Sequence, residues 1–243
     1  MAREINRPQV LDFLNRPGPL YLVGVNWQKS YLPKVNLNNA NLSYSNLSGS
    51  ILLEANLQGT DLSHANFSKT DLRGANLCGA KLTRANLSEA DLREAKLDDV
   101  DFLGCSLIGA SIGNLDLHSA KLFGANLTKA HLSGAQLEGV DLGTAKFVQA
   151  NLYRANLSKT NVWKADFTNA FLQGADLSGT TLIDLDTAIF SNAQYDDETK
   201  WPSNFDPNSV GAMKMAKEEE NIHSQDLDTP RPGQGDVLVP PAP

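Results

Sequence analysis

The chain has 243 residues, of which 41% are apolar and 7% aromatic, and its formal net charge is −7. It is long enough to bury one sizeable core, but it contains no apolar run of about 18 residues, which excludes a membrane-spanning helix of ordinary length. Residues 1–19 carry a net charge of +1, residues 20–196 carry −3, and residues 197–243 carry −5. Because no basic stripe is present, the sequence predicts no nucleic-acid partner.

The first 19 residues are expected to form an N-terminal helical cap. Residues 6–16 are predicted to be a short helix, with Asn6 as its N-cap and Pro8 in its first turn. Val10, Phe13 and Leu14 would share the face that packs on the next segment. The opening MAREINRPQV has no apolar signal segment. Together with only two cysteines, expected to stay reduced, this predicts a cytoplasmic protein.

A large apolar residue then recurs at every fifth position. From Leu32 to Leu182 there are 31 such positions, which we call centres, without an insertion or deletion. Leucine fills 25 of them, as in ANLCGAKLTRANLSEADLREAKL at residues 75–97. The others are Phe67, Phe102, Ile112, Phe147, Val162 and Phe167. Two residues before each centre stands a small residue, which is alanine in 19 of the 31 cases.

A period of five fits neither an α-helix nor a flat strand. Five residues turn a helix by roughly 140° and would scatter the centres around it, whereas a strand would point successive centres to opposite faces. A coil of short sides joined by corners fits, because every centre then points to the axis of a solenoid. The small residue also points inward, and the residue between the two, which we call the outward residue, points out. The last two residues of each five would turn the corner.

The charges of the outward residues indicate how many sides make one coil. Coils stack about 4.8 Å apart, and opposite charges on neighbouring strands stabilise the stack. A step of 20 aligns one like pair, Asp71–Asp91, and six opposite pairs, whereas steps of 15 and 25 align mostly like pairs. The six are Asp61–Lys81, Lys81–Asp101, Asp101–Lys121, Lys121–Asp141, Lys96–Asp116 and Lys146–Asp166. The sequence therefore predicts four sides and about 20 residues per coil, in a rod on the order of 40 Å long.

The repeated motif A(D/N)LXX resembles the pentapeptide-repeat family. It occurs as Ala75-Asn76-Leu77, Ala90-Asp91-Leu92 and Ala175-Asp176-Leu177, and the resemblance covers about residues 20–195. It implies an all-β fold, a right-handed quadrilateral β-helix, and a cyanobacterial source, because the family is abundant there. The handedness rests on the resemblance alone.

The repeat is expected to end in a cap and a tail. After Leu182 the register slips, and Leu185, Phe190 and Tyr195 become the next centres. Residues 196–216, which include Trp201, Phe205, Val210 and Met213, resemble a C-terminal cap of family members. Residues 217–243 are acidic and then proline-rich, ending DVLVPPAP, and are predicted to be disordered. Covers at both ends are expected because open strand edges invite aggregation.

Residues able to support chemistry are sparse. At 20 residues per coil, His118 stacks between Asp98 and Glu138, with Cys78 below Asp98, and such a column could bind a divalent metal. We favour a solvated charge ladder, because the column is convex and has no cleft. Two asparagine columns are interpreted as stacked amide hydrogen bonds: Asn36, Asn56 and Asn76, and Asn46, Asn66 and Asn86. Cys105 would point inward and Cys78 outward, so no disulfide is expected.

The sequence predicts no enzyme and no catalytic, cofactor-binding or metal site. It contains no phosphate-binding loop, no Ser–His–Asp set and no CxxC pair. An uninterrupted rod also lacks the concave, pre-organised site that catalysis requires.

One surface feature predicts an interaction site. On the side whose centres include Leu82, Phe102 and Leu122, the residue after each centre changes from Ser43, Ser63 and Thr83 in the early coils to apolar residues later. We call these later residues and two from the adjoining side the apolar stripe: Leu103, Phe123, Trp163, Ile183, Ile108 and Val148. Contiguous exposed apolar area typically marks a binding surface. Scattered surface residues, or contact with the folded-back tail, are the alternatives.

Two functions remain open at this stage. The first is a non-enzymatic protein–protein interaction module or scaffold of unknown pathway, with a protein partner on the apolar stripe and homodimerisation as a possibility. The second is a DNA-mimic modulator of DNA gyrase, which the resemblance to quinolone-resistance family members allows. Mimicry needs a strongly acidic rod, and residues 20–196 carry 14 basic against 17 acidic residues.

Overall fold

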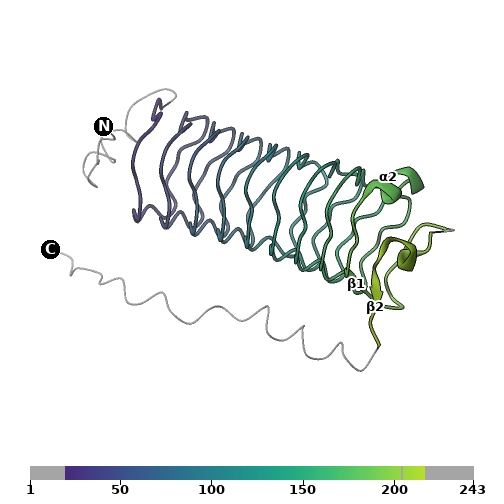
Figure 1. The fold of residues 1–243 in the computed structure, drawn as a ribbon. Coiled ribbons are helices and arrows are strands. Elements are labelled where there is room, and N and C mark those ends of the chain that lie inside the picture. The colour runs from purple at the N-terminus through teal and green to yellow at the C-terminus, as the bar shows by residue number, and fades with distance from the viewer. Residues whose placement is uncertain (1–19, 204, 217–243) are drawn as a thin grey trace.

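The computed structural model describes residues 20–203 and 205–216. The chain winds into a stack of similar coils that together form an elongated rod (Figure 1). Parallel β-bridges join outward residues that are 20 positions apart, beginning with Tyr21↔Asn41 and reaching Asn156↔Asp176. The predicted coil of 20 residues is therefore confirmed. The predicted N-terminal cap and the predicted disordered tail, residues 217–243, lie outside the described residues.

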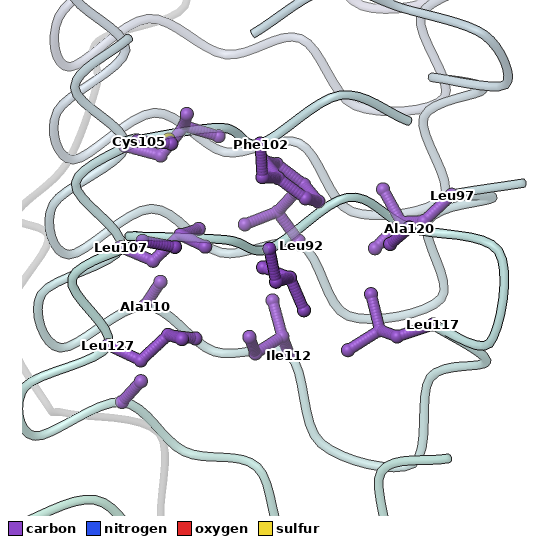
Figure 2. Close-up of a cluster of buried hydrophobic side chains, with 14 of the residues drawn as sticks. Leu92, Leu97, Phe102, Cys105, Leu107, Ala110, Ile112, Leu117, Ala120 and Leu127 are labelled. Carbon is purple, nitrogen blue, oxygen red and sulfur yellow. The ribbon is translucent and has the colours of Figure 1, made fainter. Parts of the chain in front are cut away.

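The centres and the small residues fill the axis of the rod. Figure 2 shows successive layers of this core, in which Leu92, Phe102 and Ile112 point into the coil. These side chains are buried, and so is Cys105, which takes a small position as predicted. Burial raises the pKa of the Cys105 thiol, so this cysteine behaves as a small core residue and not as a nucleophile.

The corners are tight turns, and nearly all of them contain a left-handed residue. After the centre Leu37, Asn39 has a φ of 54°, and the Ala40 N–H donates to the Leu37 carbonyl at 3.0 Å. The outward residue supports the same corner from outside, as where the Ser43 N–H donates to Asn41 Oδ1 at 3.0 Å. Outward Asn and Asp therefore satisfy a backbone donor at the corner, which explains their frequency better than amide stacking alone.

The like-charged pair Asp71–Asp91 is compensated by two arginines. Arg73 Nη2 lies 2.7 Å from Asp71 Oδ2, and its Nε lies 3.8 Å from Asp91 Oδ2, while Arg93 Nη2 lies 2.6 Å from Asp91. Burial alone would raise the pKa of Asp71, but hydrogen bonds from Arg73 and the charges of both arginines hold this pKa below its usual range. The exception to the charge pattern is thus an ion-pair network.

Replacing Arg73 with glutamine should destabilise the protein at neutral pH. The variant Arg73→Gln leaves two stacked carboxylates with one arginine, and we expect the free energy of unfolding at pH 7 to fall by up to about 1 kcal/mol. Because the pKa of Asp71 is lowered in the folded state, the stabilisation is present above the unfolded-state pKa and is lost as the pH falls through the folded-state pKa. Urea unfolding at pH 7 and pH 3 measures this. A difference between variant and wild type that is as large at pH 3 would contradict the assignment.

Within the regular coils, up to Asp176, the bridge ladder has two interruptions. No bridge joins Lys96 to Asp116 or Lys121 to Asp141, although both pairs have opposite charges. Between Asp116 and its preceding centre lies Leu115, a large residue in a position that alanine usually fills. We attribute the interruption at Lys96–Asp116 to this extra volume, because a packed core absorbs additional methylene groups only with a backbone shift.

The C-terminal end of the rod departs from the five-residue register. Helix α2 (Leu182–Thr187) replaces a corner, and the next bridges, Asp166↔Ile189 and Phe171↔Gln194, span 23 residues. Strand β1 (Gln194–Tyr195) pairs in parallel with β2 (Met213–Lys214), and the 3-10 helix η1 (Pro207–Val210) lies between them in the chain. The predicted new centres Leu185, Phe190 and Tyr195 are buried, so the predicted slip is confirmed.

Aromatic residues close this end of the core. Phe147, Phe167 and Phe190 stack with ring centroids 4.9 Å apart, and Trp201 meets Phe190 edge-on at 5.5 Å. Phe205 and Val210 also pack against the core. Met213, the fourth residue named for the cap, lies in β2. Its side chain is 51% exposed, so Met213 joins this end through the backbone pairing of β2 and not through core packing. No helix in residues 20–203 or 205–216 is long and apolar enough to cross a membrane.

Candidate functional site

The backbone ladder aligns the apolar stripe along one side of the rod. Leu103, Phe123, Gly143 and Trp163 follow centres that lie one coil apart. The Gly104 N–H donates to the Phe123 carbonyl at 3.1 Å, Gly124 donates to Gly143 at 2.9 Å, and Thr144 donates to Trp163 at 2.7 Å. The predicted column is therefore brought together from residue 103 to residue 163.

The outward residues of this side fix the backbone of the stripe. The N–H groups of Leu103 and Gly143 each donate at 3.0 Å to the aspartate two residues earlier, Asp101 and Asp141 respectively. The Trp163 N–H donates to Asn161 Oδ1 at 2.9 Å. At each of these positions a side chain holds the backbone in place before binding. Less conformational entropy is therefore lost when a partner binds.

Phe123 rests on the backbone of Gly143. A Cβ atom added to Gly143 would lie 2.9 Å from Phe123 Cε2 and 3.1 Å from Cδ2, so the ring lies against this glycine. Gly143 itself is buried, while Phe123 remains 40% exposed. Gly143 therefore leaves room for the Phe123 ring, a contact that sequence alignment of the column does not reveal.

Adding a methyl group at Gly143 should move this ring without unfolding the protein. In Gly143→Ala the new Cβ would clash with the far edge of a ring that can rotate into solvent, so we expect a destabilisation below about 1 kcal/mol. A crystal structure of the variant should show the Phe123 ring turned away from residue 143. A large loss of thermal stability, or an unmoved ring, would contradict this packing.

Trp163 is the second exposed aromatic residue of the stripe. Its side chain is 40% exposed, and Lys164 Nζ lies 4.5 Å from the ring centroid. The Lys164 N–H donates to Thr187 Oγ1 in α2 at 3.0 Å. The end of α2 therefore holds the corner next to the tryptophan.

The other members of the stripe differ in their exposure. Ile108 on the adjoining side is 36% exposed, whereas Leu103 and Val148 are half-buried. Ile183 lies in α2, where the five-residue register is broken, and its side chain is outside what the structure describes. The apolar area thus centres on Phe123 and Trp163.

In the acid–histidine column, Cys78 contacts Asp98 as the stacking predicts, whereas His118 and Glu138 pair with residues outside the column. His118 Nδ1 lies 2.6 Å from Asp116 Oδ1, Cys78 Sγ donates to Asp98 Oδ2 at 3.1 Å, and Glu138 Oε1 lies 2.6 Å from Lys159 Nζ. The hydrogen bond and the charge of Asp116 raise the pKa of His118. Among the described residues, no group of three or more His, Cys, Asp and Glu side chains could hold a metal ion.

The asparagine columns are partly linked. Asn56 Nδ2 donates to Asn36 Oδ1 at 3.0 Å, and Asn86 Nδ2 donates to Asn66 Oδ1 at 3.3 Å. These amides join neighbouring coils as predicted. Their oxygens also accept hydrogen bonds from backbone N–H groups at the corners.

Comparison with solved structures places this architecture among known proteins. HetL, a pentapeptide repeat protein involved in heterocyst differentiation regulation from the cyanobacterium Nostoc sp. strain PCC 7120, is 28% identical. The match covers 86% of this chain and 93% of HetL, with a TM-score of 0.50. QnrB1, a plasmid-mediated fluoroquinolone resistance protein, is 20% identical over 72% of this chain and 84% of its own, with a TM-score of 0.51, which is a likeness of fold alone.

Sequence comparison gives the family directly. No curated protein matches the sequence. The family model for pentapeptide repeats matches in eight copies, at residues 21–52, 52–84, 85–123, 122–143 and 145–182. These segments span the coils whose centres fill the core, and family members form right-handed quadrilateral β-helices. The chain belongs to the pentapeptide-repeat family.

Proposed function

We propose that this protein is a non-enzymatic protein–protein interaction module that binds a protein partner through the apolar stripe. The observation that carries the proposal is the alignment of two exposed aromatic rings, Phe123 and Trp163, on one side of a rigid rod. Large aromatic side chains supply much of the binding energy of protein interfaces. Their backbone is held by the coil ladder, so binding orders little of this surface.

The charge distribution supports a protein partner over mimicry of DNA. The outward column Asp61, Lys81, Asp101 and Lys121 alternates in sign along bridged coils. A surface that imitates a phosphate backbone needs uniform negative charge. We therefore rank modulation of DNA gyrase below the interaction module. The same proposal places the protein in the cytoplasm of a cyanobacterium, supported by two free cysteines and the similarity to HetL.

Affinity recovery from native lysate tests the proposal. The full chain is compared with Phe123→Asp/Trp163→Asp, and the recovered proteins are identified by mass spectrometry. The control Val23→Asp/Thr83→Asp places the same charges in the same column of the early coils. We expect a partner that the wild type and the control retain and the stripe variant loses, with unchanged circular dichroism. Light scattering of the three proteins reports on homodimerisation. Identical recovery by all three would refute the role of the stripe.

A further inference from the structure

Two spacings coincide on the surface that contains Phe123 and Trp163. These residues stand two coils apart, which is about 9.6 Å along the rod for coils stacked 4.8 Å apart. A polyproline II helix has three residues per turn and a rise of about 3.1 Å, so its residues i and i+3 lie about 9.3 Å apart on one face. An extended proline-rich segment running along the rod would therefore present equivalent residues at the two stripe positions, 123 and 163.

The chain itself carries such a segment. Residues 237–243 read VLVPPAP, in which Val237, Pro240 and Pro243 are spaced by three. Proline-rich PxxP segments bind aromatic surfaces because their conformation is restricted before binding, so little entropy is lost. We infer that residues 237–243 occupy the apolar stripe of the same molecule and compete with its partner.

The length of the intervening chain permits this contact. The described structure ends at residue 216, just after β2, and residues 217–236 connect it to the proline-rich segment. The route around the rod from the end of β2 to the stripe covers at most half of one coil, which is ten residues or about 33 Å of path. A 20-residue connection can extend to about 66 Å. A connection of this length gives an effective concentration on the order of millimolar, at which even a weak contact is populated.

The match between residues 237–243 and the apolar stripe is one of apolar contact and not of charge. The side of the rod that bears the rings carries Asp101 and Asp141 as well as Lys121 and Lys164, so it attracts neither sign strongly. Residues 217–236 are polar and acidic, whereas residues 237–243 contain no charged side chain. The apolar segment thus matches the apolar part of the surface. This inference rests on the proposed function, because it assigns a competitor to the same stripe.

Photo-cross-linking in the full chain tests the contact. A benzoylphenylalanine at position 242 replaces Ala242 and leaves the three spaced residues unchanged, and a benzoylphenylalanine at Gln225 is the control. We expect cross-links from position 242 within one molecule to peptides of residues 101–164. Their yield should fall about tenfold in Pro240→Asp/Pro243→Asp and in Phe123→Asp/Trp163→Asp, corresponding to about 1.4 kcal/mol of lost contact.

The other outcomes overturn the inference. Cross-links between two copies would assign the stripe to a neighbouring molecule, and cross-links elsewhere, or equal yields from position 225, would remove the specific contact. Partner recovery is read separately. If the cross-links form but no partner depends on the stripe, the tail contact stands and the proposed function falls. If a partner is recovered equally by wild type and Pro240→Asp/Pro243→Asp, competition by the tail is refuted while the proposed function stands.

Discussion

Phe167→Ala should lower the free energy of unfolding by about 3–5 kcal/mol, the range for removing a buried phenylalanine. Phe167 is fully buried between Phe147 and Phe190, whose ring centroids each lie 4.9 Å from its own. The substitution leaves a cavity and removes two stacking contacts, each worth about 0.5–1.5 kcal/mol beyond burial. It also loosens the support under Trp201, which packs on Phe190. Urea unfolding followed by circular dichroism measures the effect.

A matched control separates stacking from burial. Phe67 is equally buried, but its neighbours one coil away are the centres Leu47 and Leu87. Replacing each phenylalanine with leucine preserves most of the core volume. Phe167→Leu should therefore destabilise the protein more than Phe67→Leu does, by about 1 kcal/mol. Equal effects of the two leucine variants would show that the aromatic stack adds nothing beyond apolar volume.

Deleting five residues between Gly143 and Trp163 should abolish recovery of a partner without unfolding the rod. Removal of residues 149–153 takes out one side of a coil, so every later centre still points to the axis. Trp163 then stacks over Glu138 and no longer over Gly143, which moves it to an adjoining side. The apolar composition of the surface is nearly unchanged, but its alignment is lost. Affinity recovery compares this deletion with the wild type.

The control is a deletion of equal size in the early coils. Removing residues 59–63 rotates the first coils by one side but leaves the stripe from Leu103 to Trp163 intact. We expect this variant to retain the partner, with a thermal transition at or above that of the 149–153 deletion, because the latter also separates Phe147 from Phe167. Loss of the partner in both deletions would indicate that the whole rod is recognised, and retention in both would exclude alignment of the two rings as the determinant.

Most of the coil geometry could be predicted because it is repeated. The five-residue period and the charge pairs at a step of 20 each recur often enough to exclude the alternatives, and the later centres Phe190 and Tyr195 followed from the same rule. Single deviations could not be predicted in this way. Leu115 occupies an ordinary repeat position, and only the packed structure shows that the ladder opens beside it.

The candidate site was predicted as a column but not as a packed surface. The alignment of Phe123 with Trp163 follows from counting, whereas the contact of Phe123 with Gly143 depends on the direction of a side chain. Two other features had a readable signal. Asp71 and Arg73 are two residues apart, a spacing that allows an ion pair. The outward Asn and Asp residues are of the types whose side chains commonly accept a backbone N–H in turns.

The constant separation of bridged residues has a consequence for biosynthesis. In the regular coils each bridge joins residues 20 positions apart, a small fraction of the 243-residue chain. Loop closure is therefore short and equal for every coil, which favours rapid folding that propagates from one coil to the next. A chain emerging from the ribosome can complete each layer as soon as its last side is synthesised. The stack of Phe147, Phe167 and Phe190, with Trp201 over it, is added last and covers the growing end.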